Sequence, residues 1–436
     1  MGASVGARLE RYLASVPRDQ RLLPDDESLW YPPIGLLKLA RYHRERGDHV
    51  EFAVANTEGR RERGLFEQVW DRVYITTLFT WDYRQTVDAV NFYKDAVGGT
   101  VNNIYVGGIM ASLMADELFA DTGVQPTEGV LTSARMIGFE DDTNIDLLPP
   151  DYSTLCDKPQ YAIHQTYYAY ATRGCTNKCP WCGVPKLEGK LVPYIDIRGA
   201  IRQLRDEYGD KPRLKLMDNN VLASPRLPSI VRDLESLGYG RGNRTEEARP
   251  RERTIDFNQG IDATHCTEEN LRLLARLNIR PMRIAFDRAA EAPVYERALR
   301  AARAHGFSMF SNYMLYNFDG KDTPRDLYDR LMANVLLNEE WGAKSGAESG
   351  AQIYSYPMRF APICPIHGEP VNRCRDYVAE TTIDGRDRNR TRLGAALEPI
   401  LLVRMFLMAE VVRTRYSFRG RVAYDGGAVE FTACCE

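Results

Sequence analysis

Three cysteines on one short stretch are the residues of this chain with the most evident chemistry. Cys175, Cys179 and Cys182 lie in Arg173-Gly-Cys-Thr-Asn-Lys-Cys-Pro-Trp-Cys-Gly183, which gives the spacing Cys-x3-Cys-x2-Cys. Three thiolates on one loop can hold three irons of a [4Fe–4S] cluster and leave the fourth iron without a protein ligand. Such an open iron can bind a small molecule, and Trp181 beside the last cysteine is a candidate for lining this cofactor site.

Zinc and disulfides are the alternative uses of these cysteines. A structural zinc site has four ligands, often as Cys-x2-Cys pairs, and no fourth Cys or His lies close to the three in sequence. A disulfide framework is disfavoured because three is an odd number and because 9 cysteines in 436 residues are too few for a disulfide-stabilised secreted fold. The open cluster is therefore the favoured interpretation, with zinc as the main alternative.

The cysteine loop resembles that of the radical S-adenosylmethionine (radical SAM) enzymes, and the resemblance extends over roughly residues 30 to 330. In that superfamily SAM chelates the open iron, and one electron from the reduced cluster cleaves SAM to methionine and a 5′-deoxyadenosyl radical. The resemblance thus implies an enzyme with a [4Fe–4S] cluster and SAM as cofactors. It also implies a small-molecule substrate and an electron donor such as flavodoxin or ferredoxin.

The segment before the loop has alternating helix and strand patterns, which predict a parallel sheet covered by helices. The predicted strands are Val50–Val54, Val73–Leu78 and Ile104–Val106, and the predicted helices cover 34–42, 64–69 and 86–97. Pro32-Pro-Ile-Gly-Leu-Leu37, Thr77-Leu-Phe-Thr80 and Val106-Gly-Gly108 resemble the Rossmann-like, cobalamin-binding type of domain that precedes many radical SAM modules. In such sheets ligands lie at the carboxyl ends of the strands.

Cobalamin binding stays open at this point, because the Asp-x-His-x-x-Gly motif of a histidine ligand is absent. His43 and His49 are the only histidines of the N-terminal segment, and both are predicted to be solvated surface residues. Some relatives bind cobalamin without a protein ligand below the corrin ring. The alternative is a degenerate sheet that covers the active site or holds part of the substrate.

Strand and helix patterns alternate again after residue 151. The predicted strands are Tyr167–Thr172, Leu214–Met217, Thr254–Phe257, Met282–Phe286 and Phe310–Tyr316, and the predicted helices are Ala200–Tyr208, Leu227–Leu237, Glu268–Leu277 and Pro293–His305. This spacing fits the partial (β/α)6 barrel of radical SAM enzymes. The predicted α/β chain therefore comprises a Rossmann-like domain over 1–150, the barrel over 151–335 and a C-terminal extension over 336–436.

Polar residues recur where these strands end, which is where barrels carry their chemistry. Asp218-Asn219 stand where the superfamily binds the SAM amino group, in place of the more common Gly-Gly-Glu. Asn258-Gln259 and Asp262 are candidates for the SAM ribose hydroxyls. Arg283 is a candidate for pairing with the SAM carboxylate through a two-nitrogen fork.

Composition narrows the function classes. The net charge of −3 provides no basic field for nucleic acid, and no apolar run is long enough for a membrane span. Free cysteines and an oxygen-sensitive cluster favour the cytoplasm.

The favoured reaction is methyl transfer, or another radical modification, on a small-molecule metabolite. A methylthiotransferase acting on tRNA or protein is disfavoured, because no second N-terminal cysteine triad and no basic C-terminal domain occur. An iron–sulfur sensor that binds SAM without cleaving it is the non-enzyme alternative.

Several further features have no role assigned by the sequence. Cys156 is predicted to be a buried thiol, and Arg241–Arg253 a mobile, charged surface loop. Leu397–Thr414 is predicted to be an apolar-rich helix. A looser set of possible ligands follows the barrel and ends the chain: Cys364, His367, Cys374, Cys434 and Cys435.

Overall fold

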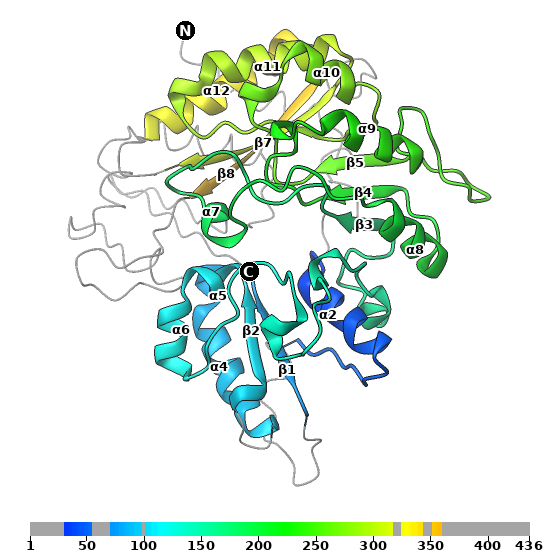
Figure 1. The fold of residues 1–436 in the computed structure, drawn as a ribbon. Helices are drawn as coiled ribbons and strands as arrows, with labels where there is room; N and C mark the ends of the chain where they lie inside the picture. Colours follow the sequence, from blue (N-terminus) through cyan, green and yellow to red (C-terminus); the bar gives the residue numbers. More distant parts are fainter. Residues whose placement is uncertain (1–29, 55–69, 98–100, 317–323, 343–350, 360–436) are drawn as a thin grey trace, which may run out of the picture.

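The computed structural model describes residues 30–54, 70–97, 101–316, 324–342 and 351–359. Figure 1 shows two lobes, and the N-terminal lobe carries β1 and β2 while the C-terminal lobe carries β3 to β8. All ladders between these strands are parallel. The described part of the chain is therefore a mixed α/β structure with parallel sheets.

The N-terminal lobe is built around the β1–β2 pair. Its elements are α2 Ile34–Glu45, β1 Val73–Thr77, α4 Tyr83–Lys94, β2 Ile104–Gly108, α5 Ile109–Leu113 and α6 Ala115–Thr122. The two strands are in register from Val73 opposite Ile104 to Thr77 opposite Gly108. Figure 1 shows α4, α5 and α6 on one side of the strands and α2 on the other.

Two predictions for this lobe need correction. Val50–Val54 is not a strand, although four of its five residues are apolar, because no strand ladder includes it in the described residues. His43 is buried rather than solvated, since both ring nitrogens have partners: Asp48 Oδ2 at 2.7 Å and the Tyr74 hydroxyl at 3.0 Å. His49 is exposed as predicted, and the helix predicted at 64–69 lies outside the described residues.

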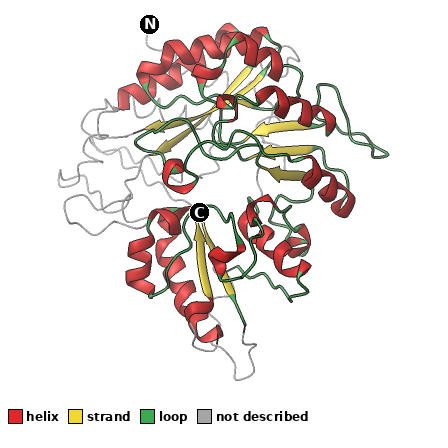
Figure 2. Ribbon diagram, in the orientation of Figure 1, coloured by secondary structure: helices red, strands yellow, loops and turns green. Residues whose placement is uncertain are grey.

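The C-terminal lobe contains six parallel strands followed by helices. The strands are β3 Thr166–Ala169, β4 Arg213–Leu216, β5 Thr254–Phe257, β6 Met282–Arg283, β7 Met309–Tyr316 and β8 Gln352–Arg359. The helices are α7 Val184–Leu187, α8 Arg198–Tyr208, α9 Leu227–Ser236, α10 Glu268–Leu274, α11 Ala292–Ala304 and α12 Pro324–Glu340. Figure 2 shows that these helices lie on the outer side of the strands, except α7, which lies on the side of the N-terminal lobe.

The six strands form two sheets in the orders β3-β4-β5 and β6-β7-β8. Two isolated parallel bridges, Ile255 with Ile279 and Ile261 with Ile284, connect the β5 region to the β6 region. The predicted positions of β3, β4, β5 and β7 are confirmed to within a few residues. The predicted strand Met282–Phe286 is shorter, because the ladder with β7 covers only Met282 and Arg283.

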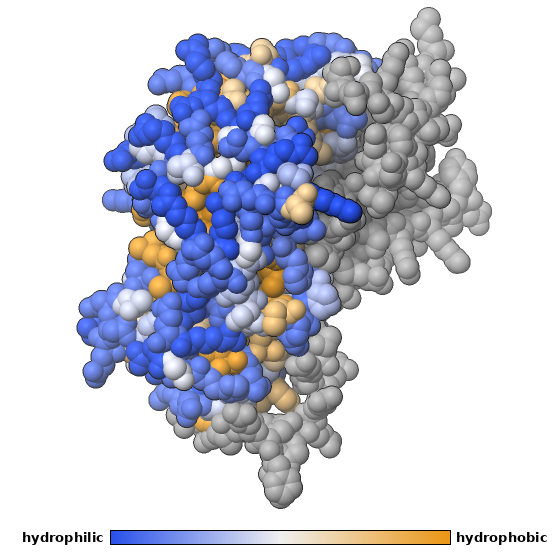
Figure 3. Space-filling view, turned by 90° about the vertical axis from the view of Figure 1, so that its right-hand side faces the viewer, coloured by the Kyte–Doolittle hydropathy of each residue, from blue (hydrophilic) through white to orange (hydrophobic). Residues whose placement is uncertain are grey.

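The hydrophobic core of the C-terminal lobe reaches into the N-terminal lobe through α2. Leu37 of α2 is fully buried in the same cluster as Leu214 of β4 and Phe310 of β7. The N-terminal lobe has two smaller clusters of its own. Figure 3 shows a surface that is mostly hydrophilic, with hydrophobic residues in small groups. Helix α2 is thus shared between the two lobes.

Three other predictions are changed by the structure. The boundary predicted at residue 335 falls inside α12, and β8 continues the sheet beyond it. Cys156 is exposed, because it caps the short helix Tyr152–Leu155 at the surface. The loop 241–253 has ordered contacts: an antiparallel bridge joins Arg244 to Glu252, and Arg253 is buried against Asp210.

The remaining predicted features lie outside the described residues. They are the helix Leu397–Thr414 and the possible ligands Cys364, His367, Cys374, Cys434 and Cys435. Within the described ranges, no helix combines the length and the apolar character that crossing a bilayer requires.

Candidate functional site

The cysteine loop begins six residues after the last residue of β3, Ala169, with Cys175. Cys175 and Cys179 are partly buried, and Cys182 is exposed. The main-chain N–H of Asn177 donates to Cys175 Sγ at 3.3 Å, and the main-chain N–H of Cys182 donates to the Cys179 carbonyl at 3.0 Å. These two local hydrogen bonds give the loop tight turns after Cys175 and after Cys179.

The three thiols influence one another electrostatically. Burial raises the pKa of the Cys179 thiol, and the neighbouring sulfurs of Cys182 and Cys175 raise it further. Burial also raises the pKa of Cys182, with Cys175 acting in the same direction. Three thiolates this close repel one another, and a bound cationic iron cluster would relieve that repulsion.

The cysteines suit a cluster better than a single ion. Among the described residues, no group of three His, Cys, Asp or Glu side chains could hold one metal ion. In a cubane each thiolate binds its own iron, so the cysteines need to share a loop rather than converge on one point. The donor set of three thiols on one loop fits a [4Fe–4S] cluster with one open iron.

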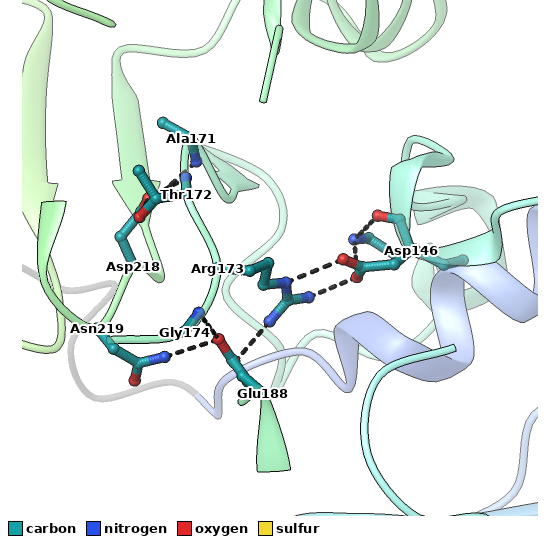
Figure 4. A network of polar contacts seen from close by, with 9 residues as sticks. Asp146, Ala171, Thr172, Arg173, Gly174, Glu188, Asp218 and Asn219 are labelled. Carbon is teal, nitrogen blue, oxygen red and sulfur yellow. Dashed lines mark hydrogen bonds and ion pairs between the residues drawn. The ribbon is translucent and has the colours of Figure 1, made fainter. Parts of the chain in front are cut away.

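Asp218, two residues after the end of β4, holds the chain that enters the loop. Its carboxylate accepts hydrogen bonds from the main-chain N–H of Ala171 at 3.1 Å, from the main-chain N–H of Thr172, and from the Thr172 hydroxyl at 2.6 Å (Figure 4). Asp218 is 1% exposed. Burial raises its pKa to about 6, and the hydrogen bonds from Thr172 and Ala171 oppose that rise.

Glu188 holds the loop from its other end. It accepts hydrogen bonds from the main-chain N–H of Gly174 at 2.7 Å and from Asn219 Nδ2 at 2.8 Å, and it pairs with Arg173 at 2.8 Å. Gly174 has a φ of +71°, and a Cβ there would lie 2.4 Å from the Lys190 carbonyl oxygen. Only glycine fits this close approach. The residues on both sides of the cysteines are thus tied together.

Arg173 connects the loop to the N-terminal lobe. Its guanidinium forms two hydrogen bonds with Asp146, at 2.9 and 2.5 Å, and lies 3.3 Å from the ring centre of Tyr170. Lys38 of α2 pairs with the same Asp146 at 2.9 Å. Burial opposes ionisation of Asp146, but the charges of Lys38 and Arg173 outweigh it and hold its pKa below the usual value.

We call the set Lys38, Asp146, Arg173 and Glu188 the interlobe network. Figure 4 shows Arg173 between Asp146 and Glu188, and Lys38 of α2 pairs with Asp146. No pattern in the sequence points to Lys38, Asp146 or Glu188. Asp146 lies 108 residues after Lys38 and 27 before Arg173. No local pattern signals contacts at such separations.

The remaining candidates for the SAM site have different surroundings. Asp262 lies beside the loop, where its Oδ2 accepts from Asn177 Nδ2 at 2.8 Å. Asn258 is buried and its Oδ1 accepts from the Tyr31 hydroxyl at 2.8 Å, while Gln259 is exposed. Trp181 is partly buried, with the Arg288 guanidinium 5.6 Å from its ring centre.

Arg283 is buried and already paired. Its Nε and Nη2 bond the two carboxylate oxygens of Asp256 at 2.7 and 2.9 Å, and its Nη1 donates to the Ser311 hydroxyl at 3.1 Å. The fork predicted for the SAM carboxylate is thus occupied by a carboxylate of the protein. The structure brings Asp218, Asn219 and Asp262 to the cysteine loop and places Arg283 in a separate ion pair. SAM contacts stay a prediction for all of these residues.

Asp287 is a further carboxyl group that the sequence analysis did not single out. It follows β6 closely and accepts a hydrogen bond from the main-chain N–H of Leu315 at 3.1 Å. Burial raises its pKa to about 6. Its charge also raises the pKa values of Cys179 and Cys182, which places it near the cysteines.

The carboxyl ends of β1 and β2 lie next to the segment that follows the cysteines. Lys186 Nζ of α7 donates to the carbonyl of Leu113 in α5 at 3.2 Å. Leu78, Phe79 and Ile109 near these strand ends are 48%, 40% and 42% exposed. This group, which we call the apolar strand ends, presents large hydrophobic side chains beside the elements that carry the cysteines.

No protein-family model matches the chain, and no curated protein matches it. Among solved structures, it is similar to TsrM, a radical SAM methyltransferase from Kitasatospora setae with cobalamin and a [4Fe–4S] cluster bound. That match has a TM-score of 0.51 and 13% identity and covers 75% of this chain and 72% of TsrM.

A second TsrM structure, with tryptophan substrate and the SAM analogue aza-SAM bound, gives a TM-score of 0.48 and 12% identity over 70% of this chain and 69% of that one. HydG, a maturase of the [FeFe]-hydrogenase, gives 0.33 and 16% over 48% and 45%. At this identity the first match shows the fold alone. The chain therefore has a fold similar to that of TsrM, with the Cys-x3-Cys-x2-Cys loop after β3.

Proposed function

We propose that this chain is a radical SAM enzyme in which Cys175, Cys179 and Cys182 hold a [4Fe–4S] cluster. The observation that carries the proposal is the three-cysteine loop after β3, whose ends are fixed by hydrogen bonds to Asp218 and Glu188. When bound, the cluster supplies the electron for reductive cleavage of SAM. The side chains around it hold the loop in one geometry and limit the access of water.

The proposal includes the architecture predicted from the sequence. The strands β3 to β8 would form the partial (β/α)6 barrel, and the lobe around β1 and β2 would be the cobalamin-binding-type domain. Six parallel strands with helices on their outer side and bridges between β5 and β6 support the first assignment. The second is supported by the parallel β1–β2 pair, which ends in Gly107-Gly108 next to α5.

For the reaction, we propose cobalamin-dependent methyl transfer to a small-molecule metabolite, with a flavodoxin- or ferredoxin-type electron donor. TsrM, which shares the fold, is described as a methyltransferase with cobalamin bound. The apolar strand ends suit a large ligand with an extended apolar face. His43 bonds Tyr74 and His49 stacks on Trp70, both at the amino end of β1, so neither offers a ligand at the carboxyl ends of the strands. Cobalamin would be held here without a histidine below it.

Radical chemistry without cobalamin is the main alternative reaction. It predicts 5′-deoxyadenosine without S-adenosylhomocysteine, whereas methyl transfer predicts that S-adenosylhomocysteine is formed. The test is anaerobic purification from cells supplied with cobalamin, followed by iron and corrinoid analysis and by product analysis with SAM and a low-potential reductant. We expect an iron–sulfur cluster with near-stoichiometric corrinoid. A cluster without corrinoid would overturn the methyl-transfer assignment, and a protein that cannot be loaded with a cluster would overturn the whole proposal.

A further inference from the structure

Three consecutive residues after β4 hold three different parts of the cysteine segment. Asp218 binds the chain before the cysteines, and Asn219 binds Glu188 behind them. The third, Asn220, contacts a cysteine directly: its Nδ2 lies 3.6 Å from Cys175 Sγ. These three residues after β4 thus fix the position of the cysteine loop, and Asn220 also contributes to the surroundings of the Cys175 sulfur.

The burial of Asn220 protects its contact with Cys175 from water. Asn220 is 2% exposed, so water does not compete for its amide. Its Oδ1 is also buried and has no hydrogen-bond partner among the described residues. An iron-bound thiolate can only accept hydrogen bonds, so the amide nitrogen has to face it. With the main-chain N–H of Asn177 at 3.3 Å, Cys175 receives two donors.

Hydrogen bonds to cluster sulfurs change the reduction potential. One-electron reduction adds negative charge to the cluster and its sulfurs, and a fixed donor stabilises that charge more than it stabilises the oxidised state. The effect is larger in a buried, low-dielectric site. A side-chain donor can be removed by substitution, unlike the main-chain N–H of Asn177. Asn220 is therefore the contact through which the effect can be measured.

We propose that Asn220 is a positioning residue that raises the reduction potential of the cluster through its hydrogen bond to Cys175. The inference rests on the proposed function, because it requires a cluster on the three cysteines. It goes beyond that function by naming the side-chain amide of Asn220 as a group that sets the reduction potential of the cluster. Asn220 need not touch SAM or the substrate for this role.

The experiment compares Asn220→Leu, which removes the donor at similar volume, with Asn220→Asp, which replaces the donor by an acceptor. Iron and sulfide contents are measured first, and the potential is then titrated anaerobically by electron paramagnetic resonance. We expect Asn220→Leu to lower the equilibrium constant for one-electron reduction about tenfold, which is about 59 mV. Asn220→Asp should lower it further, because a carboxylate repels the added electron.

Asn278→Leu is the matched control. Asn278 is also a buried asparagine, and its Nδ2 donates to the Arg253 carbonyl at 2.7 Å, just before β5 begins. We expect this variant to keep the wild-type potential.

A loaded Asn220→Leu protein with the wild-type potential would overturn the inference and leave the proposed function standing. Loss of the cluster from both Asn220 variants would assign Asn220 a purely structural role and would also overturn it. A wild-type protein without a cluster would overturn the proposed function itself.

Discussion

The base of the cysteine loop and the apolar strand ends are built differently. At the loop, the buried Asp218 and the partly buried Glu188 each accept several hydrogen bonds. At the strand ends, Leu78, Phe79 and Ile109 are large, apolar and exposed. Buried polar groups with many partners fix a geometry, whereas exposed apolar groups contribute little to folding and favour a ligand or covering surface.

Replacing Asp218 should break the loop base most severely. In Asp218→Ala the buried N–H groups of Ala171 and Thr172 lose their acceptor. Unpaired buried groups cost about 1–3 kcal/mol each, so we expect the free energy of unfolding to fall by about 4 kcal/mol. Urea denaturation of the metal-free protein measures this. A loss below about 1 kcal/mol would mean that Asp218 does not anchor the loop.

Asp287 gives a pH-dependent test of the same region. Its pKa is about 6 in the folded protein against an ordinary 3.8. Between pH 4 and 6 the folded state holds a proton that the unfolded state has lost, so stability from this group falls as pH rises through that window. Above pH 6 the ionised Asp287 costs the folded state up to about 3 kcal/mol.

Asp287→Asn should therefore be more stable than wild type at pH 7, and the advantage should disappear by pH 4. The pKa of Asp218 is also raised, but Asp218 is present in both proteins and contributes equally to both. The difference in unfolding free energy between wild type and Asp287→Asn at each pH therefore comes from Asp287. Glu339→Gln on the exposed side of α12 serves as the control. An advantage that does not change with pH would contradict the burial argument.

Glu188→Gln should have a smaller effect on stability and a clear effect on cluster retention. Glutamine keeps the shape and one acceptor oxygen but loses the charge that pairs with Arg173. We expect a loss of about 2 kcal/mol in unfolding free energy and faster release of iron to a chelator. Iron retention equal to wild type would show that the interlobe network does not hold the loop.

The smallest effect on folding is expected at the apolar strand ends. Leu78→Ser and Phe79→Ser change exposed side chains, so the unfolding free energy should shift by less than about 0.5 kcal/mol. If the proposed function is right, both variants should nevertheless retain less corrinoid than wild type. A large loss of stability would contradict the contrast between the two regions.

The sequence predicted the cysteine loop and most strands of the C-terminal lobe, because both are local signals. The cysteine spacing is read within a single stretch, and β5 was placed at Thr254–Phe257, where the structure has it. Asp218 and Asn219 were recognised as strand-end polar residues, but their contacts with Thr172 and Glu188 could not be read from the sequence.

Long-range pairing explains what the sequence did not show. Lys38, Asp146 and Glu188 look like ordinary surface charges until the fold brings them to Arg173. His43 was expected to be solvated, and its burial depends on Tyr74, which lies 31 residues away. Val50–Val54 has the apolar composition of a short strand, but no strand ladder includes it in the described residues.

The most direct test of the central claim is electron paramagnetic resonance of the reduced, reconstituted protein before and after SAM is added, beside Cys179→Ala. The proposal predicts a [4Fe–4S] signal in the wild type that changes shape when SAM binds the open iron, and no such cluster in the variant. A wild-type signal that SAM leaves unchanged, or a full cluster in Cys179→Ala, would contradict it.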